Sequence, residues 1–294
     1  MSCCPACGAH EADLVHAHPA WGAHRVVRCG RCDLARTDPQ PDDAALRAAY
    51  EVRRVPAHGA TIAVLRRRIA RAFAARAARG LGRARGRALD VGCGDGTVLE
   101  ALAARGFAAT GTELPGHGAA HRSGASIVET SDLTALRLPA ASQRLVVLRH
   151  VLEHVRDPAA TLREVRRVLE PAGRLVVAVP NLRSWQAEAT GAAWVHLDLP
   201  RHLFHFTPAT LARLVRDAGF AIERATQLSF EHGPYGWVCA LVGGGGGDAG
   251  GRRAPALAAM AALAPAAVLL SAAEALAGRG AVIELAARPV AQRT

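Results

Sequence analysis

The sequence contains no lysine, so all 36 of its basic residues are arginine. Set against 25 acidic residues, they give a formal net charge of +11 at pH 7. Such one-sided usage, beside a high content of alanine and glycine, is typical of genome-wide compositional bias. We therefore interpret the charge as a solvated basic surface, and it does not favour nucleic acid as a partner.

The chain opens without the basic-then-apolar pattern of a signal peptide, which predicts a cytoplasmic protein. Aromatic residues make up only 4% of the chain, yet half of its 294 residues are hydrophobic. A chain of this length can bury a large core, so we expect one full globular domain with smaller attachments. The sequence gives no signal for the oligomeric state.

Four of the seven cysteines form two CxxC pairs, Cys4 with Cys7 and Cys29 with Cys32. In a reducing compartment this spacing predicts one tetrahedral zinc site, within a zinc-ribbon-like segment at 1–40. A closed site of four thiolates leaves no position for substrate, so its expected role is structural. Two unrelated reduced pairs are the alternative, and four histidines are potential replacement ligands: His10, His16, His18 and His24.

Residues 41–84 show helical spacing that begins at an aspartate cap, and they predict a helical linker lying on the next domain. From 85 to 234 strands alternate with helices. The expected strands are 87–91, 107–113, 144–150, 173–181, 220–228 and 281–289, and the expected helices are 97–105, 158–170 and 207–219. This alternation predicts an α/β fold, a doubly wound and mostly parallel sheet with helices on both faces.

An insertion is expected at 235–280, before the last core strand and tail at 281–294. It contains a glycine-rich hinge, GGGGGDAGGRR, and then an uncharged, alanine-rich stretch interrupted by Pro255 and Pro265. We expect a buried or lid-forming helix there. Peripheral membrane contact through 254–277 is the alternative, since length alone would permit a membrane span.

The stretch ALDVGCGDG, residues 88–96, places a glycine loop directly after a buried strand. Its spacing is GxGxG, whereas the dinucleotide fingerprint requires GxGxxG. Asp90 and Asp95 would repel a pyrophosphate, because like charges repel at short range. A ligand with an ammonium group, a sulfonium and no phosphate suits the loop better, which predicts S-adenosyl-L-methionine as the cofactor.

Acidic residues follow the next two strands. Glu113 can accept both hydrogen bonds of a ribose diol, and Asp132 can accept from the adenine amino group with Leu133 beside the ring. Each carboxylate could instead be a helix cap. The predicted cofactor-binding residues are Asp90, Gly92, Cys93, Gly94, Gly96, Glu113, Leu114, Asp132, Leu133 and Arg149.

These motifs resemble those of the class I S-adenosylmethionine-dependent methyltransferases that act on small molecules. LDVGCGDG is similar to their first motif, Glu113 to their acidic residue after the second strand, and HVLEHVRDP (150–158) to their segment after the fourth strand. PRHLFHFTPATL (200–211) resembles a subgroup of bacterial methyltransferase-like proteins, some with an N-terminal zinc knuckle. The resemblance implies a seven-stranded sheet whose last strand is antiparallel.

The HVLEHV segment offers candidate catalytic residues. If it is helical, His150, Glu153 and His154 share one face. One interpretation makes His154 a general base oriented by Glu153. Another has all three residues bind a divalent metal, as the similar E-x-x-E-H run of ubiquinone-biosynthesis O-methyltransferases implies. In a third, the segment only shapes the cofactor pocket.

A segment after the fifth strand, 181–206, concentrates histidine and aromatic residues in a protein poor in aromatics. We interpret it as a substrate lid, with Trp194, Arg201 and His205 as substrate residues and His202 as an alternative base. A lid that packs only on itself is the alternative.

The motifs favour methylation of oxygen or carbon on a small-molecule substrate. An RNA base methyltransferase is a second hypothesis, although no Asn-Pro-Pro-Tyr-like motif follows the fourth strand. A third is a non-catalytic zinc-ribbon protein with a degenerate methyltransferase domain. The intact glycine loop argues against it.

Overall fold

The computed structural model describes residues 3–51, 60–82, 86–115, 126–130, 132–242 and 257–291. The glycine-rich hinge expected at 243–253 lies outside the described residues.

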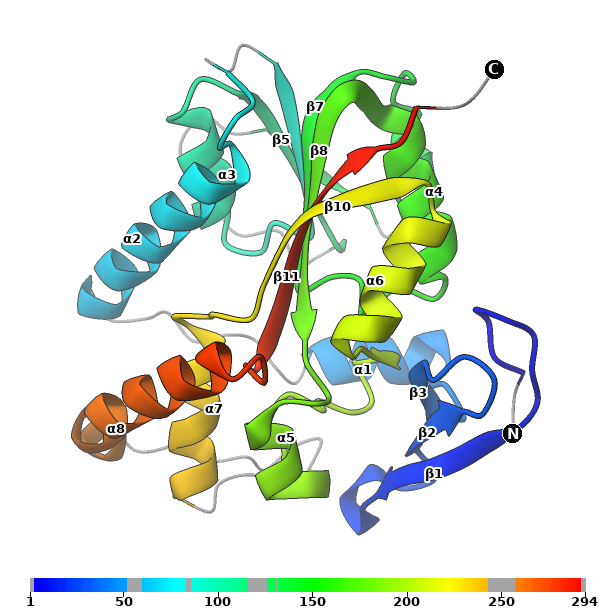
Figure 1. Ribbon diagram of the computed structural model, residues 1–294, viewed down its shortest axis with the longest axis vertical. Helices are drawn as coiled ribbons and strands as arrows, with labels where there is room; N and C mark the ends of the chain where they lie inside the picture. Colours follow the sequence, from blue (N-terminus) through cyan, green and yellow to red (C-terminus); the bar gives the residue numbers. More distant parts are fainter. Residues whose placement is uncertain are drawn as a thin grey trace.

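A seven-stranded sheet forms the centre of the molecule, in the order β10-β11-β8-β7-β4-β5-β6 (Figure 1). Its strands are β4 (Arg87–Val91), β5 (Ala108–Glu113), β6 (Ser126–Glu129), β7 (Gln143–Arg149), β8 (Leu169–Pro180), β10 (Phe220–Thr226) and β11 (Val282–Pro289). β11 is antiparallel to β10 and β8, and the remaining pairings are parallel. This confirms the doubly wound sheet with an antiparallel last strand.

Helices cover both faces of the sheet (Figure 1). One face carries α2 (Ala60–Ala77) and α3 (Thr97–Ala103), and the other carries α4 (Pro158–Val168) and α6 (Pro208–Asp217). Apolar residues of α2 and α3, such as Phe73 and Leu102, form one core cluster with the sheet, while α4 and α6 contribute to a second. Burial of the apolar helix faces in these two clusters is the main favourable contribution to the stability of the layered fold.

The helix starts follow their capping residues. Thr207 and Thr210 form a capping box before α6, with Pro208 in its first turn. Asp157 caps α4, but this helix ends at Val168 because Leu169 is already extended. β8 therefore begins four residues earlier than the sequence predicts.

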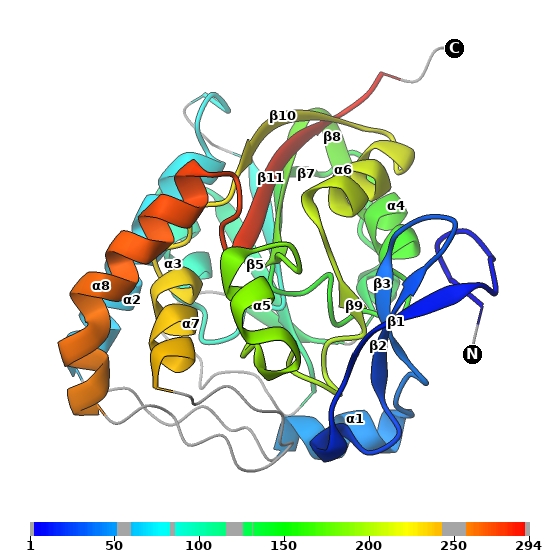
Figure 2. The ribbon, with the colours of Figure 1, turned by 60° about the horizontal axis from the view of Figure 1, so that its bottom comes forward.

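A second, four-stranded sheet has the order β1-β2-β3-β9. Its strands are β1 (Ala12–Ala17), β2 (Arg25–Cys29), β3 (Ala35–Asp38) and β9 (Phe204–His205). The first three come from the N-terminal segment, whereas β9 comes from the predicted lid. The two segments therefore share one sheet beside the main one (Figure 2). α1 (Asp43–Glu51) follows, and Asp42 Oδ1 accepts a hydrogen bond from Ala45 N at 2.7 Å, which confirms the expected aspartate cap.

Three further helices lie beyond the carboxyl edge of the main sheet: α5 (Trp185–Thr190), α7 (His232–Leu241) and α8 (Leu257–Leu276). The short 3-10 helices are η1 (Pro19–Trp21), η2 (Leu133–Leu136) and η3 (Gly191–Ala193). α8 packs beside α7 and buries Ala267, Ser271 and Glu274, while its Leu269 stays exposed. Among the described helices, none has the length and apolar character needed to span a membrane.

Candidate functional site

A cavity of about 190 Å³ lies where β4 and β7 end. Ligands of doubly wound sheets bind at this position, because the strand order reverses there. Its lining residues are Arg66, Ile69, Ala70, Gly92, Cys93, Gly94, Asp95, Thr97, Val98, Arg149, His150, Glu231 and His232. Of the predicted cofactor-binding residues, Gly92, Cys93, Gly94 and Arg149 line this cavity.

The loop after β4 needs glycine for two different reasons. Gly92 has φ +64°, and a Cβ there would lie 2.5 Å from Val151 Cγ2, so the loop and the turn after β7 touch. Gly94 has φ +55°, and a Cβ there would meet nothing within 4 Å. The open side of the loop is therefore free for a ligand. Gly96 has φ +74° and sits at the N-cap of α3.

Asp90 is the next-to-last residue of β4 and is buried. Burial raises the pKa of its carboxyl to about 7, although the charge of Arg149 acts in the opposite direction. Its Oδ2 atom has no hydrogen-bond partner within the described part of the chain. A buried carboxylate oxygen without a partner is costly, which makes Asp90 a candidate for pairing with a cationic ligand.

Glu113 lies next to the loop at the end of β5. Its carboxylate accepts hydrogen bonds from Gly94 N at 2.7 Å and Leu114 N at 2.9 Å. The loop thus holds the carboxylate in place, and each oxygen keeps a lone pair for a ligand hydroxyl.

The residues predicted for adenine have local roles in the structure. Asp132 caps η2, where its oxygens accept from Thr134 N at 2.8 Å and Thr134 Oγ1 at 2.6 Å. These hydrogen bonds lower the pKa of the Asp132 carboxyl. Leu133 is buried in the main core. The cap interpretation of Asp132 therefore applies, and adenine contact stays a prediction.

Two charged residues at the cavity, Arg66 and Glu231, were missed by sequence reasoning. Arg66 of α2 lies 3.0 Å from Asp95 Oδ2 and 3.5 Å from Glu231 Oε1. Arg149 Nη2 lies 2.5 Å from Glu231 Oε2. Burial raises the pKa of the Glu231 carboxyl, but the neighbouring His232, Arg149 and Arg66 outweigh it and lower the pKa to about 2. Sequence offered no signal, because an arginine in an arginine-rich helix looks solvated.

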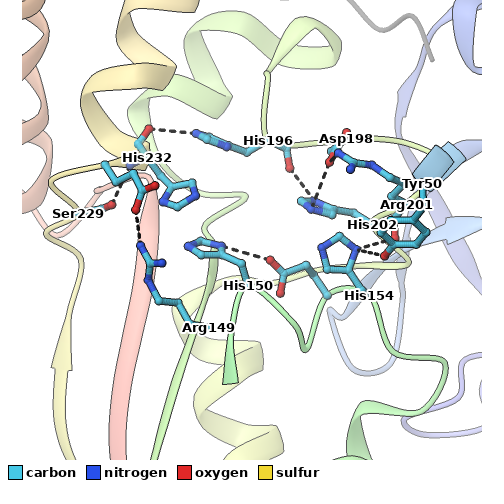
Figure 3. Close-up of polar contacts among 12 residues, drawn as sticks. Tyr50, Arg149, His150, His154, His196, Asp198, Arg201, His202, Ser229 and His232 are labelled. Atoms are coloured by element: carbon cyan, nitrogen blue, oxygen red, sulfur yellow. Dashed lines mark hydrogen bonds and ion pairs between the residues drawn. The ribbon is translucent and has the colours of Figure 1, made fainter. Parts of the chain in front are cut away.

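His150 occupies the turn after β7, and HVLEHV is not helical, so the condition for His150, Glu153 and His154 to share one helix face is not met. The segment 151–157 forms turns and bends, and His150 has φ +57°. The left-handed residue sends its ring into the cavity, where it stacks on His232 with centroids 3.9 Å apart (Figure 3). Its Nδ1 atom lies 3.3 Å from Glu153 Oε1. Burial lowers the pKa of His150 well below its usual value, so the ring is neutral.

Glu153, His154 and His202 form a second group, with one ligand atom of each within 4.8 Å of the others. Figure 3 shows His154 and His202 side by side. His150 is not part of this group, so the ligand set of the metal interpretation, His150, Glu153 and His154, does not come together. Glu153 is only 1% exposed, and its oxygens accept no hydrogen bond among the described residues. Burial raises the pKa of Glu153 to about 7.

Both histidines of this group use Nδ1 on backbone carbonyls. His154 Nδ1 lies 3.0 Å from Arg201 O, and also 3.0 Å from Tyr50 Oη. His202 Nδ1 lies 2.9 Å from His196 O. A carbonyl only accepts, so each Nδ1 carries the proton and each Nε2 keeps a lone pair.

The predicted lid packs on the N-terminal segment rather than only on itself. Trp194 is 2% exposed and lies in a core cluster with Trp21 and Val26. It is a packing residue here. Arg201 pairs with Asp198 and lies over the Tyr50 ring at 5.6 Å.

The four predicted cysteine ligands come together. Cys4 Sγ lies 3.5 Å from Cys32 Sγ, Cys7 Sγ lies 3.5 Å from Cys29 Sγ, and all four sulfurs are within 4.8 Å of one another. Four sulfurs bound to one Zn²⁺ would be about 3.8 Å apart. Of the described histidines considered as replacements, none joins this cluster.

A protein-family model described as a methyltransferase domain matches residues 60–225. The chain is 30% identical over 158 residues to a ubiquinone biosynthesis O-methyltransferase of Thiobacillus denitrificans, covering 48% of this chain and 67% of the relative. It is 31% identical over 169 residues to the protein of that name from Cereibacter sphaeroides, covering 53% and 67%. The similarity thus spans about half of this chain.

Solved structures support the fold. An S-adenosylmethionine-dependent methyltransferase of Archaeoglobus fulgidus superposes with a TM-score of 0.51 at 16% identity, covering 76% of this chain and 94% of that one. The 1,6-didemethyltoxoflavin-N1-methyltransferase of Burkholderia thailandensis, solved with S-adenosylhomocysteine, gives 0.50 at 17% identity, covering 96% and 100%.

The raised pKa of Asp90 predicts a pH-dependent stability. In the folded protein the pKa of Asp90 is about 7, above its ordinary value of 3.8. The favourable contribution of its protonated carboxyl to the free energy of unfolding is therefore present at low pH and is lost as the pH rises through 7. Asp90→Asn removes this loss. The free energy of unfolding of the variant, relative to that of the wild type, should therefore rise by about 2–3 kcal/mol between pH 5 and pH 8. Urea unfolding of the ligand-free protein at both pH values measures it.

Asp217→Asn, at an exposed position in the last turn of α6, controls for the change of side chain. An Asp90→Asn curve that runs parallel to wild type between the two pH values would contradict the assignment.

Proposed function

The chain belongs to the S-adenosylmethionine-dependent methyltransferases, and we propose that it methylates a hydroxyl group of a small molecule. The observation that carries the proposal is the cavity between the glycine loop and His150, whose Nδ1 faces Glu153. The names of the relatives, O-methyltransferases, support oxygen over an RNA base as the acceptor.

The residues around the cavity fit the cofactor. S-adenosylmethionine, when bound, supplies the methyl group. Glu113 would accept from its ribose hydroxyls, and the open side of Gly94 leaves room for it. Arg66 and Arg149, which now pair with the Glu231 carboxylate, would suit its carboxylate.

His150 replaces His154 as the proposed general base. His150 lines the cavity, whereas the Nδ1 of His154 is held by Arg201 O on the lid side. Because Glu153 faces Nδ1 of His150, Nε2 is the nitrogen that takes the proton of the acceptor hydroxyl. The lowered pKa keeps this nitrogen unprotonated at neutral pH.

Glu153, His154 and His202 would hold a divalent cation. Two imidazole nitrogens and a carboxylate, with both Nδ1 atoms bound to carbonyls, are typical of metal ligands and their supporting contacts. A cation there would neutralise the buried Glu153 and polarise an acceptor hydroxyl nearby.

The cysteine cluster would hold one structural Zn²⁺. Its sulfur spacing and its four thiols leave no position for a substrate. Its expected contribution is to the folding of β1 to β3.

The cofactor assignment predicts binding of S-adenosylhomocysteine. We expect Glu113→Gln to weaken that binding about tenfold or more, because the charged acceptor for the ribose hydroxyls is lost. Isothermal calorimetry measures it, with Glu164→Gln on α4 as the matched control. A wild-type protein that gives no binding heat would remove the cofactor from the proposal.

The roles of His150 and His154 can be separated. His150→Ala should keep S-adenosylhomocysteine affinity and lower turnover about 100-fold or more, as expected for loss of a general base. His154→Ala should instead abolish Mn²⁺ binding. Labelled S-adenosylmethionine with catechol, phenol and benzyl alcohol as acceptors measures turnover, and paramagnetic resonance measures bound Mn²⁺.

Unchanged turnover in His150→Ala would refute the base. Failure of the wild type to bind Mn²⁺ would refute the cation site.

Purified protein should contain about one Zn²⁺ per chain. Cys29→Ser should lose the metal, whereas Cys3→Ser, at an exposed cysteine outside the cluster, should retain it. Elemental analysis after dialysis decides the outcome. Full zinc occupancy in Cys29→Ser would exclude the four-cysteine site.

A further inference from the structure

The backbone of residues 202–204 is held from two sides. On one side, Leu203 N and Phe204 N donate to the Glu153 carbonyl at 2.7 and 3.1 Å. On the other, Leu203 O accepts from Thr37 N at 3.0 Å, and Phe204 pairs with Arg36 in the β3–β9 ladder. This short segment therefore joins the N-terminal sheet to the turn that carries Glu153.

The Thr37 hydroxyl contacts the two histidines of this segment. It donates to His202 O at 2.6 Å, and its oxygen lies 3.2 Å from His205 Nε2. A hydroxyl has one hydrogen, so the second contact must be an N–H of His205 donating to Thr37 Oγ1. Burial, helped by the charge of His16, lowers the pKa of His205 to about 3, which keeps the ring neutral, and the contact with Thr37 selects the Nε2–H tautomer.

The strand that carries Thr37 starts directly after the second cysteine knuckle. Cys29 N donates to Leu34 O at 3.1 Å across the turn that contains Cys32, and β3 begins at Ala35. The backbone carbonyl of Cys32, in the knuckle itself, accepts a hydrogen bond from Arg213 of α6. A change in the knuckle thus reaches β3 within a few residues of Thr37.

We propose that Thr37 is a positioning residue through which the four-cysteine segment supports the acceptor site, by fixing His202 and His205. The proposal rests on the proposed function in placing the acceptor near His202. Thr37 touches no reacting atom and acts through the lid backbone.

Nitrogen-15 NMR of histidine-labelled full-length protein tests the proposal. In Thr37→Val, His205 should lose its single Nε2–H tautomer pattern, and exchange of the Leu203 and Phe204 amides should rise about tenfold or more. Thr37→Ser should restore both, since it keeps the hydroxyl. Zinc content and S-adenosylhomocysteine affinity should not change, and Thr226→Val on β10 is the control for a distant threonine.

A Thr37→Val protein with unchanged histidine signals and unchanged amide exchange would overturn the proposal. If this variant does not fold, removal of zinc from the wild type by a chelator gives a second test. Stripping should shift the His202 and His205 signals and speed the same amide exchange, and added zinc should reverse both. A lid unaffected by stripping would overturn the proposal equally.

The coupling through Thr37 and the proposed methyltransferase function can be refuted separately. If the wild type does not bind S-adenosylhomocysteine but stripping shifts the lid signals, the coupling stands and the proposed function falls. If the wild type binds S-adenosylhomocysteine but the lid signals change neither in Thr37→Val nor on removal of zinc, only the coupling is refuted.

Discussion

The rest of the site depends on the contact between Gly92 and Val151. Because Gly92 has no side chain, the turn after β7 packs directly on the glycine loop after β4, where a Cβ would lie 2.5 Å from Val151 Cγ2. The two elements meet because β4 and β7 are parallel neighbours whose carboxyl ends share one edge. A larger residue at 92 would push the turn, and with it the adjacent His150, out of the cavity.

The same turn faces two ways. His150, in the left-handed conformation, points to the cavity, while His154 points to the lid and contacts Arg201 O. Glu153 lies between them. Its carboxylate lies close to both histidine rings, and its backbone carbonyl accepts hydrogen bonds from the lid backbone. A helix would have placed all three side chains on one face, so the irregular turn is what separates the proposed base from the proposed cation site.

The sequence predicted what local pattern determines. The alternation of strands and helices, the glycine loop and the meeting of four cysteines all follow from spacing along the chain. The turn at HVLEHV could not be predicted, because its left-handed residue is a histidine and not a glycine. The sequence also could not predict that Arg66 reaches the cavity or that β3 pairs with β9. Each feature depends on a residue more than 100 positions away in the chain.

The burial of Glu153 links the two proposed roles. A carboxylate that is 1% exposed and accepts no hydrogen bond among the described residues must either hold a proton or pair with a cation. With a proton it can donate to His150 only if the Nδ1 of that ring is bare, which would leave Nε2 protonated and unable to act as a base. A cation on Glu153, His154 and His202 would keep Glu153 ionised, so that it accepts from His150 Nδ1–H and leaves Nε2 free. Base catalysis by His150 therefore favours a cation at its neighbour, and the lid that supplies His202 becomes part of the same electrostatic unit.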